Sequence, residues 1–241
     1  MRQGDVKFGF LGRGPIEERC LSHIRERVSL VVSDEEFIHK FSDTKGCVFI
    51  SNDDRNEDEI LDAITENGIN CLISVQHLWI LSEDLIDAVD GFSFNLHNAK
   101  LPEYKGYNAI SHSILNGDPE YVTTIHWIAP DVDSGDIVYE ESVVIDDDDT
   151  AMSLYLKTIP AAEENFKRLV LAIDSGEIPR HRMKDGGIFY GKEEIVGMKE
   201  IKCLTDFDEI DRKSRAFYFP PHEPSFFVLG GKKFYVSQKM Y

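Results

Sequence analysis

Cysteine is scarce in this chain of 241 residues. The four thiols, Cys20, Cys47, Cys71 and Cys203, show no CxxC or Cys/His ligand spacing. Cys47 and Cys71 lie in apolar runs, where a thiol packs as a small hydrophobic group. The spacing therefore gives no support to a thiolate metal centre, and it predicts buried, reduced thiols instead of a disulfide framework.

Long hydrophobic runs are also missing. The opening residues MRQGDVKFGFLGRG contain no apolar signal core, and no uninterrupted apolar stretch approaches the roughly 20 residues that span a bilayer. The sequence therefore predicts a cytoplasmic protein with no membrane partner.

Basic residues are outnumbered, because 26 Lys and Arg stand against 44 Asp and Glu and give a formal net charge of -18. A field of this sign repels polyanions at long range, which disfavours a nucleic-acid partner. Two local clusters, HRMK at 181–184 and RKSR at 212–215, still concentrate donors that can hold a small phosphorylated ligand at contact distance.

The first hundred residues alternate between two kinds of segment. Apolar runs read VKFGFLG, SLVVS, GCVFIS, NCLISV and FSFNLH, and segments of helical character between them read EERCLSHIRERV, NEDEILDAITENG and SEDLIDAVDG. This alternation predicts an α/β fold with a Rossmann-like, mainly parallel sheet and helices on both faces. Functional sites of such sheets lie at the C-terminal edge of the strands, where FNLHN ends.

The second half predicts a helix at AISHSILNG, a hairpin of YVTTIHWIAP and DIVYEESVVI around DVDSG, and a long helix after the acidic run at 146–149. That run resembles a calcium loop, but carboxylates at a helix start favour the helix dipole. We therefore predict capping and no metal site. Residues 1–175 are predicted to form the core, and 176–241 a small β appendage that closes with the hairpin FVLGGKKFYVSQ.

Asn95 and His97 lie two apart on a predicted strand, so their side chains point to the same side. A neutral imidazole can take a proton from an attacking amine, while an amide NH2 donates to an oxygen that becomes negative. Asp133 or Asp136 in DVDSGDI could orient the imidazole, on a turn where Gly135 allows close approach to a ligand. The pair alone more simply predicts a strand-end cap and a packed histidine.

The residues NLHNAKLPEYKG, followed by DVDSGDI with Asp133 36 positions after His97, resemble the catalytic core of the folate-dependent formyltransferases over about residues 5–175. The resemblance implies that Asn95, His97 and Asp133 are catalytic and that the cofactor is 10-formyltetrahydrofolate. It also implies a folate pocket formed by HLWILS and the DVDSG turn, with contacts from Trp79, Ile80, Leu81, Val132 and Asp133. By residue type alone, Trp79 in an apolar run is more simply a core residue.

Among these enzymes, the stretches ISVQHLWIL, YKGYNA and RKSRAFYFPPHEPSFF most resemble the sugar N-formyltransferases, which modify nucleotide-linked amino sugars for bacterial surface polysaccharides such as O-antigen. The resemblance implies a dTDP-linked 4-amino-4,6-dideoxyglucose as acceptor and a homodimer. The candidate substrate contacts supply cations, hydrogen bonds or an aromatic face. They are Gln76, Lys105, Tyr107, Asn108, Arg182, Lys184, Arg215 and Tyr218. Solvated charge and core packing are the simpler interpretations of the last four.

Other functions explain less of the chain. A glycinamide ribonucleotide transformylase would typically end near the long helix, and a tRNA formyltransferase would carry a larger, basic C-terminal barrel. A noncatalytic folate or nucleotide-sugar binder would not need all three predicted catalytic residues. The stretch FLGRG invites a dinucleotide site, but it lacks the third spaced glycine, so we predict a tight strand-to-helix turn near the acceptor.

Overall fold

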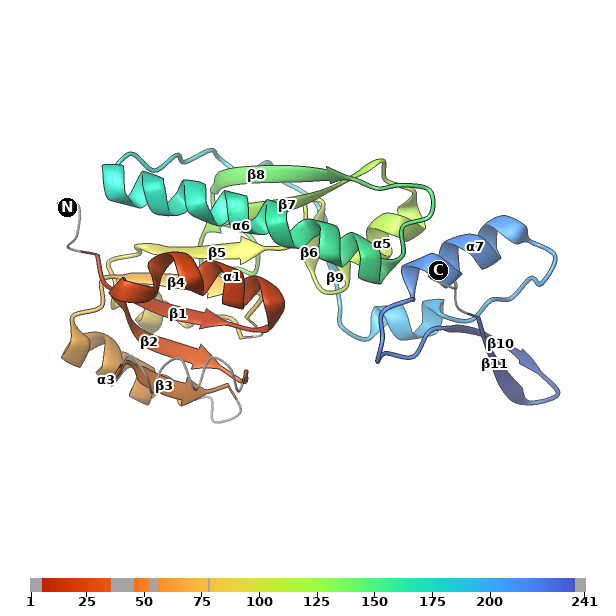
Figure 1. Ribbon diagram of the computed structural model, residues 1–241, viewed down its shortest axis with the longest axis horizontal. Helices are drawn as coiled ribbons and strands as arrows, with labels where there is room; N and C mark the ends of the chain where they lie inside the picture. The colour runs from red at the N-terminus through yellow and green to blue at the C-terminus, as the bar shows by residue number, and fades with distance from the viewer. Residues whose placement is uncertain (1–5, 36–45, 53–55, 78, 237–241) are drawn as a thin grey trace. The chain divides into compact units, whose positions relative to one another are not determined.

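A seven-stranded sheet forms the centre of the fold in the computed structural model, which describes residues 6–35, 46–52, 56–77 and 79–236 (Figure 1). Its strands, in spatial order, are β3 (Val48–Ser51), β2 (Val28–Ser33), β1 (Phe8–Gly12), β4 (Cys71–Val75), β5 (Ser93–His97), β7 (Glu120–Trp127) and β8 (Ile137–Val144). The first five pair in parallel, and β7 runs antiparallel to β5. The prediction of a mainly parallel α/β sheet is therefore confirmed.

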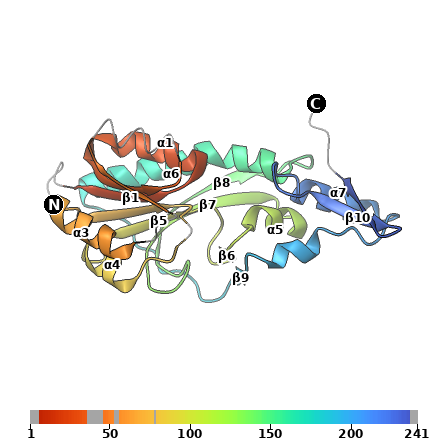
Figure 2. The same ribbon diagram turned by 90° about the horizontal axis from the view of Figure 1, so that it is seen from below.

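Helices cover both faces of the sheet (Figures 1 and 2). One face carries α1 (Gly14–Ile24) and α6 (Ala151–Ser175), and the other carries α3 (Glu57–Asn67) and α4 (Glu83–Asp87). Phe10 of β1 packs edge-on against Phe166 of α6, with ring centroids 6.2 Å apart. The next residue, Leu11, belongs to the buried cluster of α3 and α4. The strands are apolar throughout because successive side chains are buried on opposite faces.

The helix ends follow local signals. Asn56 caps α3 by accepting a hydrogen bond from the Glu59 N–H at 3.3 Å, and Gly68 ends it in the left-handed region at φ 62°. The helix predicted at 17–28 instead begins at Gly14, where Pro15 fits the first turn, and gives way to the 3₁₀ turn η1 (Arg25–Arg27).

The chain divides into two compact units. Unit 1 comprises Met1–Asn98, Thr123–Glu141 and Ile159–Asp185, and unit 2 comprises Ala99–Val122, Ser142–Thr158 and Gly186–Tyr241. Elements of unit 2 are β6 (Tyr104–Gly106), α5 (Ala109–Asn116), β9 (Ile188–Tyr190), η2 (Glu194–Met198), α7 (Phe207–Ala216), β10 (Ser225–Leu229) and β11 (Lys232–Val236). The closing hairpin is confirmed as β10–β11, turning at Gly230 and Gly231. The division at residue 175 stays a prediction.

Two elements of unit 2 differ from expectation. The Gly-rich stretch IFYG at 188–191 is typical of a turn, but residues 188–190 form the strand β9, because they find a parallel partner in the distant β6. The helix α7 was not predicted at all. Its start is a capping box in which Asp206 accepts from the Glu209 N–H and the Glu209 carboxylate accepts from the Cys203 N–H.

The acidic run at 146–149 makes hydrogen bonds to side chains of the helix that follows it. The Asp149 carboxylate accepts hydrogen bonds from Ser153 Oγ at 2.8 Å and Lys157 Nζ at 2.5 Å. Cys71 is buried as predicted, whereas Cys47 is only half-buried, and all four thiols are free. Within the described ranges, no helix is long and apolar enough to cross a membrane.

Candidate active site

The three predicted catalytic residues lie together in unit 1, at the C-terminal end of β5. Asn95 and His97 occupy the same face of β5, and the turn between β7 and β8 brings Asp133 to them. His97 Nδ1 lies 3.6 Å from Asp133 Oδ1, and their side chains are 13% and 10% exposed. The separation is slightly longer than a hydrogen bond, as is common in resting active sites that tighten around a substrate.

The turn that carries Asp133 is tightly constrained. Asp133 has a φ of 47°, a left-handed conformation that is uncommon outside glycine and that clusters at functional sites. Two residues later, a Cβ at Gly135 would lie 1.8 Å from the Trp127 carbonyl oxygen. The close approach predicted at Gly135 is therefore to β7 of the same chain. Asp136 forms an ion pair with Arg180, with Oδ2 3.4 Å from Nε. Asp133 is therefore the carboxylate beside His97.

A fourth residue, His126 of β7, completes the group and was missed from the sequence. It stands opposite Asn95 in the antiparallel register and is 3% exposed. Its Nδ1–H donates to the Trp127 carbonyl at 2.7 Å, because a carbonyl can only accept. Nε2 is then the acceptor for the Asn95 amide NH2 at 3.0 Å. His126 therefore holds the Asn95 amide with its NH2 group toward the site, and one N–H remains for another acceptor.

Replacing His126 with phenylalanine should lower kcat by about 5- to 100-fold and leave KM nearly unchanged. The ring shape is kept, but the buried acceptor worth roughly 1–3 kcal/mol is lost, so the Asn95 amide is no longer held in place. Steady-state kinetics with circular dichroism as a folding check would measure this. His126→Gln, which restores an acceptor, should recover part of the rate. Equal rates for wild type and His126→Phe would remove the positioning role.

The predicted folate segment begins where β4 ends. The Gln76 N–H donates to the Leu96 carbonyl at 3.4 Å, and Gln76 has a φ of 52°. Trp79 is half-buried against the apolar cluster that includes the buried Leu81, whereas Ile80 is 57% exposed. Trp79 and Leu81 thus support the core, and Ile80 presents apolar surface. Leu78 lies outside the described residues.

The predicted substrate contacts fall in both units. In unit 2, Lys105 lies on β6, and the Tyr107 N–H donates to the Tyr190 carbonyl at 2.9 Å. Asn108 follows with a φ of 59°, and its amide donates to the Lys192 carbonyl at 3.4 Å. These three residues lie within 105–108, from the end of β6 to the start of α5, and their substrate role stays a prediction.

The basic candidates differ in their surroundings. Arg182 and Lys184 are exposed in unit 1. Arg215 in unit 2 is 13% exposed, and its guanidinium donates to Asp211 Oδ2 at 2.9 Å and to the Asp149 carbonyl at 3.2 Å. A phosphate would have to compete with these contacts. Tyr218 is half-buried, and its carbonyl accepts from the Met152 N–H. All four assignments stay predictions.

The FLGRG stretch forms a tight strand-to-helix turn between β1 and α1. A Cβ at Gly12 would lie 2.9 Å from Glu17 Cγ, so the turn packs directly on the Glu17 side chain. Glu17 is fully buried, and its Oε2 accepts from Ser33 Oγ–H at 3.0 Å. Burial raises the pKa of this carboxyl from 4.5 to about 8. Near neutral pH, Glu17 is therefore mostly an uncharged acid.

The C-terminal edge of a Rossmann-like sheet carries an amide, an imidazole and a carboxylate, a set of groups suited to acyl transfer. The family model described as formyl transferase matches residues 23–171, more than half of the chain. The chain belongs to the formyl transferase family, as the sequence resemblance predicted.

The individual relatives share less than 30% sequence identity with this chain. The GDP-perosamine N-formyltransferase of Brucella melitensis is 29% identical over 165 residues, a match that spans 68% of this chain and 63% of that protein. A solved 4-N formyltransferase from Francisella tularensis superposes with a TM-score of 0.82 at 19% identity and 99% coverage of each chain. An N-formyltransferase from Helicobacter canadensis, solved with folinic acid and dTDP-3-aminofucose, gives 0.77 at 19% identity, covering 95% of this chain and 86% of that one. The two structures confirm the fold.

Proposed function

We propose that this protein is a sugar N-formyltransferase, which moves the formyl group of 10-formyltetrahydrofolate to the amine of a nucleotide-linked amino sugar. The observation that carries the proposal is the convergence of Asn95, His97 and Asp133 at one sheet edge, with His126 holding the amide. Membership of the formyl transferase family supports the same reaction.

Each residue has a distinct task in the proposed reaction. As the amine attacks the formyl carbon, the N–H of Asn95 not used by His126 donates to the oxygen that gains negative charge. His97 takes the proton that the amine must lose and would return it to the tetrahydrofolate nitrogen as the formyl C–N bond breaks, while Asp133 keeps the imidazole oriented and offsets its positive charge. The low exposure of His97 and Asp133 strengthens both electrostatic effects by limiting water.

The residues after β4 offer the kinds of surface that the proposed cofactor needs. A pterin needs a flat apolar surface and nearby backbone polar groups, and residues 76, 77, 79 and 80 combine irregular backbone with the exposed Ile80 and the half-buried Trp79. Val132, on the turn with Asp133, is half-buried as well. When bound there, 10-formyltetrahydrofolate would supply the formyl group as an activated acyl donor.

The acceptor is proposed to be a dTDP-linked 4-amino-4,6-dideoxyglucose used for surface polysaccharide. The 4-N formyltransferase from Francisella tularensis matches this chain over 99% of both lengths, including the C-terminal region that a shorter purine enzyme would not explain. The relative from Helicobacter canadensis was solved with a dTDP-linked amino sugar, whereas the relative from Brucella melitensis is described with a GDP-linked one. The experiment must therefore compare dTDP and GDP as the nucleotide that carries the amino sugar.

A panel of acceptors tests the proposal. Tetrahydrofolate release from 10-formyltetrahydrofolate would be measured with dTDP-linked and GDP-linked 4-amino sugars, dTDP-linked 3-amino sugars and glycinamide ribonucleotide. We expect turnover with the dTDP-linked 4-amino sugar. Turnover only with glycinamide ribonucleotide would instead assign a purine-synthesis step, and ligand binding without turnover would indicate a binding protein.

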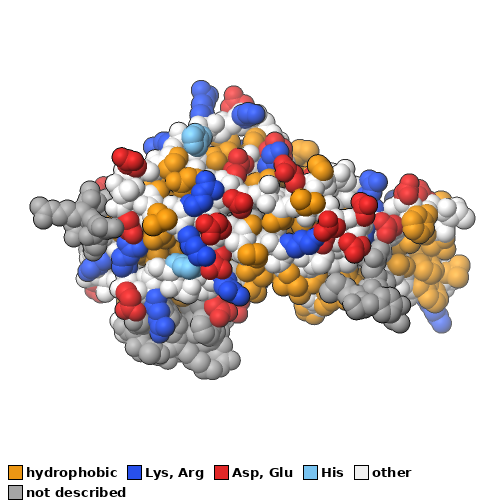
Figure 3. Space-filling view, turned by 45° about the horizontal axis from the view of Figure 1, so that its top comes forward, with side chains coloured by type: hydrophobic (Ala, Val, Ile, Leu, Met, Phe, Trp, Pro, Cys, Tyr) orange, Lys and Arg blue, Asp and Glu red, His pale blue; other side chains and the backbone are white. Residues whose placement is uncertain are grey.

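The closing hairpin is proposed to pair with a second copy of the chain. Phe227 and Phe234 stack across β10 and β11 at 5.3 Å, while Leu229 and Tyr235 are 63% and 57% exposed. Figure 3 shows hydrophobic side chains gathered over this region. An aromatic, two-stranded sheet that is this exposed is an association surface.

Sedimentation velocity should therefore show a dimer at micromolar concentration, and Leu229→Ser with Phe234→Ser should shift it to monomer. Leu229 is 63% and Phe234 44% exposed, and neither belongs to the buried core, so the fold should survive the change. Leu171→Ser, which removes a 68% exposed leucine from α6, serves as the matched control. A monomeric wild type would rule out this association.

A further inference from the structure

A cavity of about 390 Å³ lies within unit 2. Its walls come from α5, β6, β9 and the start of β7, and none of Asn95, His97 or Asp133 lines it. The volume falls in the range of roughly 300–1,000 Å³ that is typical of small-molecule sites. The proposed function assigns no ligand to this cavity.

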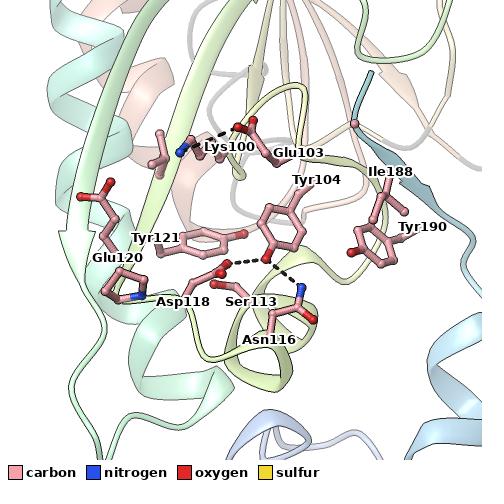
Figure 4. Close-up of a pocket in the computed structure, with 13 residues that line it drawn as sticks. Lys100, Glu103, Tyr104, Ser113, Asn116, Asp118, Glu120, Tyr121, Ile188 and Tyr190 are labelled. Carbon is pink, nitrogen blue, oxygen red and sulfur yellow. Dashed lines mark hydrogen bonds and ion pairs between the residues drawn. The ribbon is translucent and has the colours of Figure 1, made fainter. Parts of the chain in front are cut away.

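One end of the cavity is a cluster of polar side chains (Figure 4). The Tyr104 hydroxyl donates to Asp118 Oδ2 and accepts from the Asn116 amide at 2.9 Å. Burial, followed by this bond to Asp118, raises the pKa of Tyr104, so the hydroxyl stays a donor. The tyrosine and the amide are thereby fixed in place, and they hold the Asp118 carboxylate at the cavity wall.

Ser113 is the feature that points to a ligand. Its side chain is fully buried, it lines the cavity, and its Oγ has no hydrogen-bond partner among the described residues. A buried hydroxyl left without a partner destabilises the fold, so a group in the cavity that completes its hydrogen bonds would be held there favourably.

The net charge of the lining residues indicates the sign of the charge that the ligand carries. Glu103, Asp118 and Glu120 contribute three carboxylates, against a single ammonium from Lys100. Lys100 Nζ lies 3.9 Å from Glu103 Oε1, so its charge is offset at the rim. The excess of negative charge attracts a cation and repels phosphates and carboxylates.

Aromatic rings complete the cavity. Tyr104 and Tyr190 stack with centroids 5.7 Å apart and planes at 17°, and the 2% exposed Tyr121 lines the cavity beside them. Ring faces favour both cations and the C–H faces of polyhydroxylated chains. We propose that this cavity binds a small polyhydroxylated organic amine in its protonated form, at a site whose lining includes none of the formyl-transfer residues.

Three probes with one carbon skeleton test the charge requirement. Glucamine, sorbitol and gluconate differ at one chain end, which carries an ammonium, a hydroxyl or a carboxylate. Calorimetric titration of the full chain should give a Kd of roughly 1 mM for glucamine and binding at least about tenfold weaker for sorbitol and gluconate. Absence of glucamine binding, or equal binding of sorbitol, would overturn the proposal.

Variants locate the binding. Glu120→Gln and Asp118→Asn should each weaken glucamine binding by about fivefold or more, because each removes a lining carboxylate. Glu66→Gln, which removes an exposed carboxylate from α3, is the matched control and should change nothing. If Asp118→Asn unfolds, Glu120→Gln and Glu103→Gln, both at exposed positions, carry the test. His97→Asn should keep the affinity, and a loss there would place glucamine in the proposed catalytic site instead.

Discussion

Replacing His97 with asparagine should lower turnover with the amino-sugar acceptor by about 10²- to 10⁴-fold, while the affinity for both substrates changes little. Asparagine keeps a polar group of similar reach but has no nitrogen that can take a proton near neutral pH. His97 is 13% exposed, so water is poorly placed to replace it as the base. Asp133→Asn should give a smaller loss, because the imidazole remains but loses the carboxylate that orients it.

Single-turnover rates, with substrate affinities measured separately, would distinguish a lost base from lost binding. His222→Asn is the matched control, since His222 is an exposed histidine that is not among the candidate site residues. Near-normal turnover in His97→Asn would remove the catalytic assignment and leave the family fold without this mechanism.

Replacing Glu17 with glutamine should stabilise the protein, increasingly so as the pH rises. The folded carboxyl has a pKa of about 8 and the unfolded one 4.5, so the folded state binds the proton more tightly between these values. Raising the pH through this window therefore destabilises the wild type, whereas glutamine has no proton to lose. The gain should grow from about 1 kcal/mol at pH 5.5 to about 3 kcal/mol at pH 7.

Chemical denaturation across this pH range would measure the difference, and the Tm gain at neutral pH should be roughly 6–12 °C. Glu18→Gln is the matched control, because it makes the same charge change on the exposed side of α1. A gain of the same size at both pH values would mean that Glu17 is not titrating, and a loss of stability would show that its ionised form is accommodated.

The sheet and the closing hairpin were predictable because their signals are local. The alternation of apolar runs and amphipathic segments follows from strands buried on both faces, and Gly230–Gly231 marks a turn between two strands. The helix α7 had a local signal too, the Asp206 and Glu209 capping box. The RKSR cluster lies within this helix, and its charges indicate a basic patch more directly than a helix.

Other features depended on pairings between distant segments. β9 has no strand signal of its own and exists because β6 lies alongside it. His126 belongs to the site only because the antiparallel register of β5 and β7 sets it opposite Asn95. The choice of Asp133 over Asp136 depended on which carboxylate the turn directs to His97 and which it directs to Arg180.

The sequence by itself thus determined the α/β class and the formyl transferase family and predicted the site residues Asn95, His97 and Asp133, because hydrophobic periodicity and motif spacing are properties of the linear sequence. Only the tertiary structure decided that His126 holds the Asn95 amide, that Glu17 is a buried acid with a raised pKa, and that Ser113 faces a carboxylate-lined cavity. Burial and partner geometry arise from the packing of segments far apart in sequence, and these set hydrogen bonding and protonation.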